Sequence, residues 1–138
     1  MAPISFEPEI YTYNIDSGQH VSNIAYIQWM EIGRLKLLEA AGISVHELQE
    51  RGIAPILRHT EITYSKPLYL GDKVRVEMWI SELKKISAIM RFRFIRLPDE
   101  VVAKGKQEGL FFSLETKKPY KLTHEERLCF SEFTENDK

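Results

Sequence analysis

The chain has 138 residues, of which 28% are charged and 43% hydrophobic, a length and composition typical of one soluble globular domain. Its formal net charge of -1 gives no global electrostatic attraction to nucleic acid or to a membrane surface. The single cysteine, Cys129, excludes an internal disulfide and is typical of a reducing compartment, and the N-terminus lacks the basic and apolar regions of a secretory signal. We therefore expect one cytoplasmic domain over residues 1–138 that binds neither nucleic acid nor membrane.

The first predicted element is a strand over residues 4–13. Pro8 lies within it, which indicates that the strand begins at the edge of a sheet. The residues that favour β-structure here are Phe6, Ile10, Tyr11, Thr12 and Tyr13.

A polar loop and a long helix follow, and they form the central feature of the sequence. The loop runs from Asp16 to Asn23, and both Ser22 and Asn23 favour the N-cap position. No proline interrupts the chain before Gly42, which stands where helices commonly end in a left-handed residue. The pattern predicts one helix over residues 23–41.

This helix is apolar almost all the way round, so we expect it to be enclosed. Its thin polar stripe consists of Gln28, Lys36 and Glu39, while Glu31 and Arg34 are spaced to pair on its flank. The apolar positions are Tyr26, Ile27, Trp29, Met30, Ile32, Gly33, Leu35, Leu37, Leu38 and Ala41.

A short helix and a long strand come next. Ser44 can cap a helix over residues 45–51 that Gly52 stops, and period-two alternation then predicts a strand over 53–65.

The last part of the chain alternates in the same way. Segments near 74–81 and 86–95 predict a β-hairpin with one solvent-exposed face. A strand over 101–114 contains Gly105 and Gly109, where a bulge or a close backbone approach is expected. Thr123-His124-Glu125-Glu126 has capping-box spacing, which predicts a short C-terminal helix.

These elements predict an α+β fold in which an antiparallel sheet of about five strands wraps around one long helix. A single sheet covers the helix on one side only. Trp79, Ile89 and Ile95 are predicted to point outward, and a second copy of the chain is the simplest cover for them. We therefore expect a homodimer or a homotetramer.

The loop before the helix could carry chemistry. Asp16 supplies a carboxylate, Gly18 supplies flexibility, and the first amides of a helix can polarise a carbonyl oxygen. Asp16 could then act as a nucleophile or as a general base on water. The carboxylate and the helix amides together make a minimal acyl-transfer site. The simpler interpretation is that Asp16 only shapes a turn.

Two motifs also carry a resemblance. Residues 16–26, read as Asp-Ser-Gly-Gln-His-Val-Ser-Asn-Ile-Ala-Tyr and followed by Trp29-Met30-Glu31-Ile32-Gly33-Arg34, resemble the loop and helix of the 4-hydroxybenzoyl-CoA thioesterase-like branch of the hotdog superfamily. Residues 64–74, Tyr-Ser-Lys-Pro-Leu-Tyr-Leu-Gly-Asp-Lys-Val, resemble a turn of the same family. The resemblance covers about residues 4–122.

The resemblance implies a hotdog fold and an acyl-CoA thioesterase that serves lipid metabolism, with a site shared between paired subunits. It places the catalytic carboxylate on Asp16 and the oxyanion-binding amide near Asn23. The chain departs from the family pattern at Asn14, Gln19 and Ser22. The Gln-His-Val variant is similar to a subset that acts on long-chain acyl-CoA.

The remaining expectations concern ligands. The substrate is expected to be an acyl-CoA or acyl carrier protein thioester, with CoA as part of the substrate and no separate cofactor. His20 is favoured as a loop-fixing hydrogen bonder over a general base, and Asn23 as a helix cap. His46, His59 and His124 match no metal-ligand spacing, so no metal is expected.

Two rival functions stay open. Hotdog hydratases also use an Asp and a His, but their motif spaces them by five positions, whereas Asp16 and His20 are four apart. A non-catalytic acyl-binding protein of the same fold is the second rival, and in it Asp16 would be incidental.

Overall fold

A computed structural model of the chain describes residues 1–135. One antiparallel sheet carries the fold, and its strands lie in the order β1-β3-β4-β5-β2, with β6 paired to β5. The strands are β1 (Ile4–Phe6), β2 (Ile53–Tyr64), β3 (Val74–Leu83), β4 (Ala88–Arg96), β5 (Glu100–Ser113) and β6 (Lys118–Pro119). The helices are α1 (Asn23–Ala40), α2 (Val45–Glu50) and α3 (His124–Cys129), with short 3-10 turns at Thr12–Asn14 and Ser131–Phe133.

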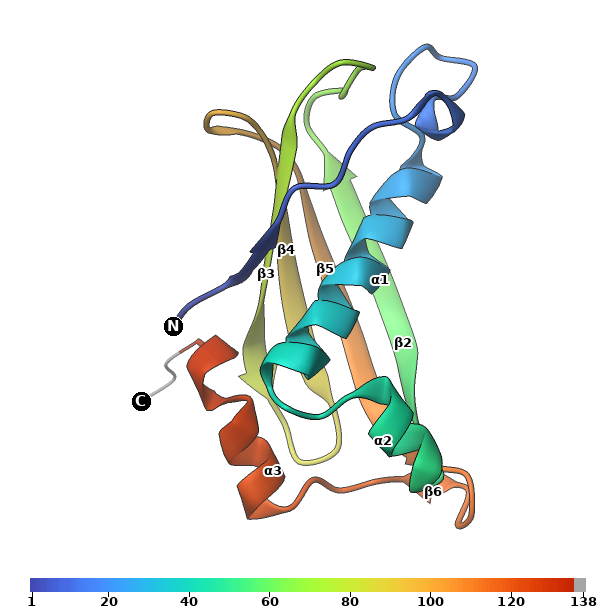
Figure 1. The fold of residues 1–138 in the computed structure, drawn as a ribbon, viewed down its shortest axis with the longest axis vertical. Helices are drawn as coiled ribbons and strands as arrows, with labels where there is room; N and C mark the ends of the chain where they lie inside the picture. Colours follow the sequence, from blue (N-terminus) through green and yellow to red (C-terminus); the bar gives the residue numbers. More distant parts are fainter. Residues whose placement is uncertain (136–138) are drawn as a thin grey trace.

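Helix α1 lies lengthwise against the curled sheet, which confirms the predicted architecture (Figure 1). Ser22 caps it by accepting a hydrogen bond from the Ile24 N–H at 3.1 Å, and the chain leaves it through Gly42 at φ +79°. The helix approaches the sheet closely, because a Cβ on Gly105 would lie 2.6 Å from the Cε of Met30. The close backbone approach expected at Gly105 is thus confirmed.

One flank of α1 stays open within a single chain. Tyr26, Met30 and Leu37 are buried against the sheet, but Ile27 is 43% exposed and Leu35 45% exposed. Strand β2, the neighbouring edge of the sheet, is exposed over most of its length. The expected enclosure is therefore only half achieved by one copy of the chain.

The predicted first strand over residues 4–13 is wrong beyond Phe6. Only residues 4–6 pair with β3, and Thr12–Asn14 form a 3-10 turn. The Asn14 side chain accepts the Tyr11 N–H at 2.7 Å, which satisfies that amide locally and competes with strand pairing. Tyr11 and Tyr13 are exposed and stack on each other with ring centroids 5.5 Å apart.

Ile89 and Ile95 were expected to need cover from a second copy, and this expectation is wrong. Both lie outside the main core cluster, on the strand face opposite to Phe92 and Phe94, but they are already buried within one chain at 8% and 5% exposure. Trp79 is covered within the chain, since its indole donates to Glu135 at 2.6 Å and Arg93 lies over its ring. These three residues therefore do not argue for a second copy.

The C-terminal segment, residues 120–135, folds back over the end of the molecule where α1 finishes (Figure 1). Thr123 and Glu126 form the predicted capping box at the start of α3. Phe130 and Phe133 are buried, and the Glu135 N–H donates to the carbonyl of Ile80 at 2.8 Å. This segment is therefore part of the core rather than a loose tail.

Across residues 1–135, no helix combines the length and apolar character needed to cross a bilayer.

Candidate active site

The loop from Asp16 to His20 is a tight, closed turn. An isolated bridge pairs Ile15 with Val21, the Asp16 N–H donates to the carbonyl of His20 at 3.0 Å, and the Gln19 N–H donates to the carbonyl of Asp16 at 3.0 Å. Gln19 adopts φ +71°, a conformation that favours glycine. The position where the resembling family has glycine is thus left-handed here too, although it is occupied by glutamine.

Asp16 takes part in this turn. Its Oδ1 accepts the Gly18 N–H at 2.8 Å, and the side chain is 40% exposed. The turn-forming role considered for Asp16 is therefore present, and it occupies one carboxylate oxygen. A Cβ on Gly18 would lie 3.2 Å from that oxygen and 3.0 Å from the His20 ring, so a side chain at position 18 would crowd both groups.

His20 is close to Asp16 but does not hold it firmly. Its Nδ1 lies 3.9 Å from the Asp16 Oδ1 and 3.4 Å from the carbonyl oxygen of Val21. The ring is 44% exposed. This position fits the loop-fixing role, and it also keeps an imidazole within reach of the carboxylate.

The helix start lies two residues beyond His20. Ser22 is the N-cap and Asn23 is the first helical residue, so the expectation that Asn23 caps the helix is wrong. The cap oxygen of Ser22 engages the Ile24 N–H, and within residues 1–135 the Asn23 N–H donates to no acceptor. Free N–H groups at a helix start carry partial positive charge and can receive an anionic or carbonyl oxygen.

The two motifs of the sequence meet directly at this point. The Val21 N–H donates to the carbonyl of Leu68 at 2.8 Å, and the Leu68 side chain is fully buried. The Asp72 carboxylate stabilises the turn that contains Leu68, because it accepts the Tyr69 N–H at 2.8 Å and a hydrogen bond from Arg96 at 3.0 Å. The second motif thus anchors the loop of the first.

Arg96 and its partners form a charged brace beneath that turn. Hydrogen bonds to Glu100 and then to Asp72 raise the pKa of the Arg96 guanidinium above its ordinary value. The hydrogen bond from Lys66, and then that from Arg96, lower the pKa of Glu100. Sequence reasoning missed this brace, because its members are spread over more than thirty positions and only Lys66 and Asp72 belong to a motif.

Asn14 was also missed as a site-supporting residue. It is buried at 7% exposure, its side chain holds the Tyr11 N–H, and its carbonyl accepts the N-cap Ser22 N–H at 2.7 Å. One signal pointed to it, since the resembling family often carries an Asp at this position.

The first turn of helix α1 packs against a cluster of aromatic rings. Tyr26 packs edge-on to Tyr64 and to Phe94, each with centroids 5.0 Å apart. Burial, and then the neighbouring Tyr64, raise the pKa of the Tyr26 hydroxyl to about 12. This packing leaves the hydroxyl neutral and fixes the helix start against the sheet.

Glu31 and Arg34 do not form the predicted ion pair within 4 Å. Arg34 instead donates to the side-chain oxygen of Gln107 at 2.7 Å, and Gln107, which is fully buried, donates to Thr60 at 3.2 Å. Burial lowers the pKa of Arg34, and the nearby Glu31 partly offsets that shift. The network links α1 through β5 to the edge strand β2.

Within residues 1–135, no group of three or more His, Cys, Asp or Glu side chains is arranged to hold a metal ion. The loop, the helix start and the brace are therefore the polar features gathered at this end of α1.

A long helix packed on a curled antiparallel sheet, with a carboxylate-bearing loop at the helix start, defines a hotdog domain. The model of the thioesterase-like superfamily matches residues 11–127, and the chain belongs to that superfamily. The expectation of a thioesterase-type enzyme is thus confirmed at the level of the family.

Three relatives illustrate the match. The chain is 24% identical over 113 residues to the "Putative acyl-CoA thioesterase YneP" of Bacillus subtilis (strain 168), and this alignment covers 82% of each sequence. It is 26% identical to the chloroplastic acyl-acyl carrier protein thioesterase ATL3 of Arabidopsis thaliana, over 95% of this chain and 69% of that protein. The crystal structure of a DHNA-CoA thioesterase from Staphylococcus aureus superposes with a TM-score of 0.87 at 20% identity, over 96% of this chain and 91% of that one.

Proposed function

We propose that this protein hydrolyses acyl-CoA thioesters to a free acid and CoA. The observation that carries the proposal is the joining of the two motifs, in which the Val21–Leu68 hydrogen bond holds the Asp16 loop directly before the open start of α1. A carboxylate and an unpaired helix amide, here the Asn23 N–H, at one place are the minimum that acyl transfer to water requires. The relatives named above support the same reaction class.

In this reaction the thioester carbonyl lies at the start of α1, near the Asn23 N–H. The partial positive charge of the first helical turn stabilises the oxyanion that forms when the carbonyl carbon is attacked. Collapse of that oxyanion breaks the carbon–sulfur bond, and the CoA thiolate leaves and takes up a proton. The products are the carboxylic acid and the free thiol.

Asp16 supplies the second half of the chemistry by one of two routes. As a general base it accepts a proton from the attacking water and later returns it to the thiolate. As a nucleophile it forms an acyl anhydride with the substrate, which water then hydrolyses. The hydrogen bond from the Gly18 N–H orients the carboxylate in either route.

His20 and Asn23 have supporting roles in this scheme. His20 limits the mobility of the loop from its position 3.9 Å from Asp16, and Asn23 contributes its backbone amide rather than its exposed side chain. The working protein is a homodimer or a dimer of dimers, because the open flank of α1 and the edge strand β2 leave an apolar surface uncovered.

Release of free thiol from a panel of acyl-CoA thioesters tests this function. We expect kcat/KM to rise from acetyl-CoA to medium or long acyl-CoA by several-fold for every two carbons, since each buried methylene contributes about 0.8 kcal/mol. An aromatic acyl-CoA is the alternative optimum. Acetyl-CoA or malonyl-CoA as the best substrate would contradict an apolar acyl site.

The same panel separates the rival functions. Thiol release from acyl carrier protein thioesters but not from CoA thioesters would change the carrier and keep the reaction. Hydration of enoyl-CoA without thiol release would identify a hydratase, and binding of acyl-CoA without turnover would identify a non-catalytic acyl-binding protein. Either of these last two results would overturn the proposal.

A further inference from the structure

A second feature lies at the other half of α1, away from the Asp16 loop. It is a cavity of about 440 Å³ between the helix and the sheet, within the size range of small-molecule pockets. None of the apolar residues in the first two turns of the helix, Tyr26, Ile27, Trp29 and Met30, lines it. Three of these four are buried in the core, so the available space lies further along the helix.

The cavity has an open rim and a closed end. Leu35 on α1, Ile56 on β2 and Ile86 in the β3–β4 connection line the rim and are 45%, 42% and 43% exposed. Leu38 on α1, Ile80 on β3 and Phe130 line the closed end and are 7%, 2% and 3% exposed. An apolar cavity with an apolar rim open to solvent is the shape that an alkyl or aryl chain fills favourably.

The C-terminal segment closes the far end. Phe130 contributes its ring and lies 6.5 Å from the ring of Phe111 on β5, while Tyr120 and Leu122 complete that side of the lining. The lining residue Phe130 lies beyond residue 127, where the match to the superfamily ends.

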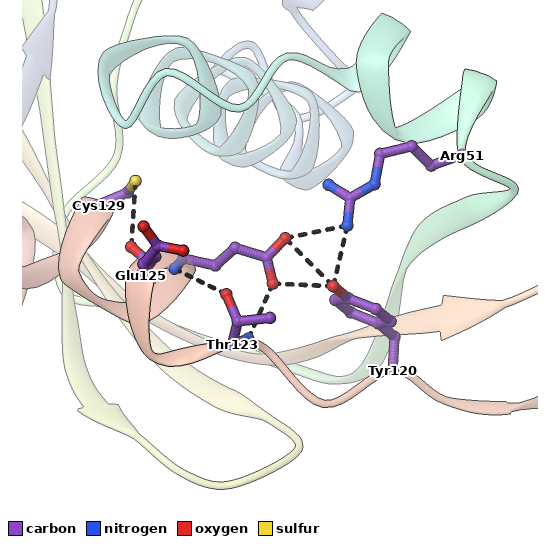
Figure 2. A network of polar contacts seen from close by, with 6 residues as sticks. Arg51, Tyr120, Thr123, Glu125 and Cys129 are labelled. Atoms are coloured by element: carbon purple, nitrogen blue, oxygen red, sulfur yellow. Dashed lines mark hydrogen bonds and ion pairs between the residues drawn. The ribbon is translucent and has the colours of Figure 1, made fainter.

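Two sets of bonds hold the segment in place. The first set is drawn in Figure 2 and centres on Arg51, the C-cap residue of α2. The Arg51 guanidinium donates to the Tyr120 hydroxyl at 2.9 Å and to Glu126 at 3.0 Å. The Tyr120 hydroxyl in turn donates to Glu126 at 2.9 Å. In the second, Arg127 donates to the backbone carbonyls of Leu83 and Lys84 at 3.0 and 2.8 Å. The closed end is thus tied to α2 and to the β3–β4 connection.

The rim opens toward the surface expected to pair with a second copy. Ile56 and Leu57 of the rim belong to β2, the edge strand of the sheet. A two-fold pairing of β2 edges is antiparallel, so it brings the helix start of one copy toward the cavity end of the other. Within one chain the cavity begins at Glu31, about 12 Å along the helix from Asn23.

We propose that this cavity receives the acyl chain of the substrate and that Phe130 of the C-terminal segment sets the longest chain accepted. The proposal rests on the hydrolase function proposed above. Replacing Phe130 by alanine opens the closed end, and filling the cavity with a larger side chain at Ala88, which also lines it, shortens the available space. The two changes therefore move the chain-length optimum in opposite directions.

The test measures kcat/KM for saturated acyl-CoA thioesters from C2 to C18 in the wild type, Phe130→Ala, Ala88→Leu and a matched control, Phe133→Ala. Phe133 is buried in the same segment but does not line the cavity. We expect Phe130→Ala to move the optimum to chains longer by about two to four carbons, Ala88→Leu to shorten it, and Phe133→Ala to keep the wild-type optimum. Ala88→Leu decides the question if Phe130→Ala does not fold.

Binding of S-hexadecyl-CoA, a thioether that cannot be hydrolysed, separates this proposal from the function on which it rests. If no thioester is hydrolysed but Phe130→Ala strengthens and Ala88→Leu weakens binding by at least ~5-fold, the cavity assignment holds and the hydrolase proposal fails. If thioesters are hydrolysed with the same chain-length profile by the wild type, Phe130→Ala and Ala88→Leu, the cavity assignment is overturned and the hydrolase proposal stands.

Discussion

The Asp16 carboxylate is shared between a structural contact and the proposed chemistry. One oxygen fixes the turn through the Gly18 N–H at 2.8 Å, while the side chain as a whole stays 40% exposed. An asparagine at this position keeps an oxygen that can accept the same hydrogen bond and removes the negative charge. Position 16 thus allows loop geometry and catalysis to be separated by a single substitution.

Tyr26 shows how strongly a buried residue beneath the site affects stability at high pH. Burial raises its pKa to about 12 from an ordinary value of 10.0, so the unfolded chain loses this proton at a lower pH than the folded chain. The contribution to stability is complete below pH 10 and is lost as the pH rises toward 12.

We therefore expect the free energy of unfolding of the wild type to fall about 2 to 3 kcal/mol more than that of Tyr26→Phe between pH 10 and 12. Phenylalanine keeps the ring packing against Tyr64 and Phe94, so the comparison isolates the hydroxyl. Urea unfolding at a series of pH values measures the difference. Parallel pH dependences in the two proteins would show that the hydroxyl is not buried as described.

Most elements could be predicted because their local signals agree with the fold. Helix α1 carries a cap, a long apolar pattern and a terminating glycine, and its bounds were predicted to within one residue. Strands β3 and β5 alternate clearly between apolar and polar residues, and the capping box of Thr123 and Glu126 predicts α3. In each case propensity, capping and periodicity indicate the same element.

The elements that were missed depend on contacts distant in sequence. The first strand pairs only over residues 4–6, and Asn14 satisfies the Tyr11 amide within a 3-10 turn instead of a strand. Register shifts leave Ser81 of β3 and Val102 of β5 without a partner, so that the neighbours Val102 and Ala103 are both buried. A bulge inserts one residue without a clear sequence signal, so the face of every later residue in that strand becomes uncertain.

The candidate site was likewise predictable in some parts and not in others. The motif supplies Asp16, His20 and the helix start, but the Val21–Leu68 hydrogen bond, the Asp72–Arg96 brace and the cavity result from the packing of several elements. Spacing along the chain carries no information on such contacts. The roles of Asp16, His20 and Asn23 therefore stay predictions, while their positions are now defined.

At the scale of the whole molecule, the uncovered surface is continuous from α1 to the edge of the sheet. Leu35, Ile56 and Leu57 line one cavity together, so the exposed flank of the helix and strand β2 are neighbours. Exposed apolar surface beside an unpaired strand edge is typical of an interface between identical chains. This observation replaces Trp79, Ile89 and Ile95 as the reason to expect an oligomer.

We expect light scattering at micromolar concentration to give twice or four times the mass of one chain. Ile27→Glu, on the exposed flank of α1, should increase the monomer fraction, because a charge is costly to bury at an interface. Leu128→Glu is the matched control, since Leu128 is an equally apolar exposed residue on α3. A monomeric wild type would contradict the expected dimer and the shared site.

The role of the Asp16 carboxylate is decided by thiol release from the best acyl-CoA of the panel, measured for the wild type, Asp16→Asn and Asp99→Asn. Asp99 is an exposed aspartate in the turn between β4 and β5, so its substitution controls for the loss of one negative charge. We expect Asp16→Asn to lower kcat by at least ~100-fold with substrate binding largely kept, and Asp99→Asn to behave as the wild type. Asp16→Asn with most of the wild-type activity would show that Asp16 only shapes the turn.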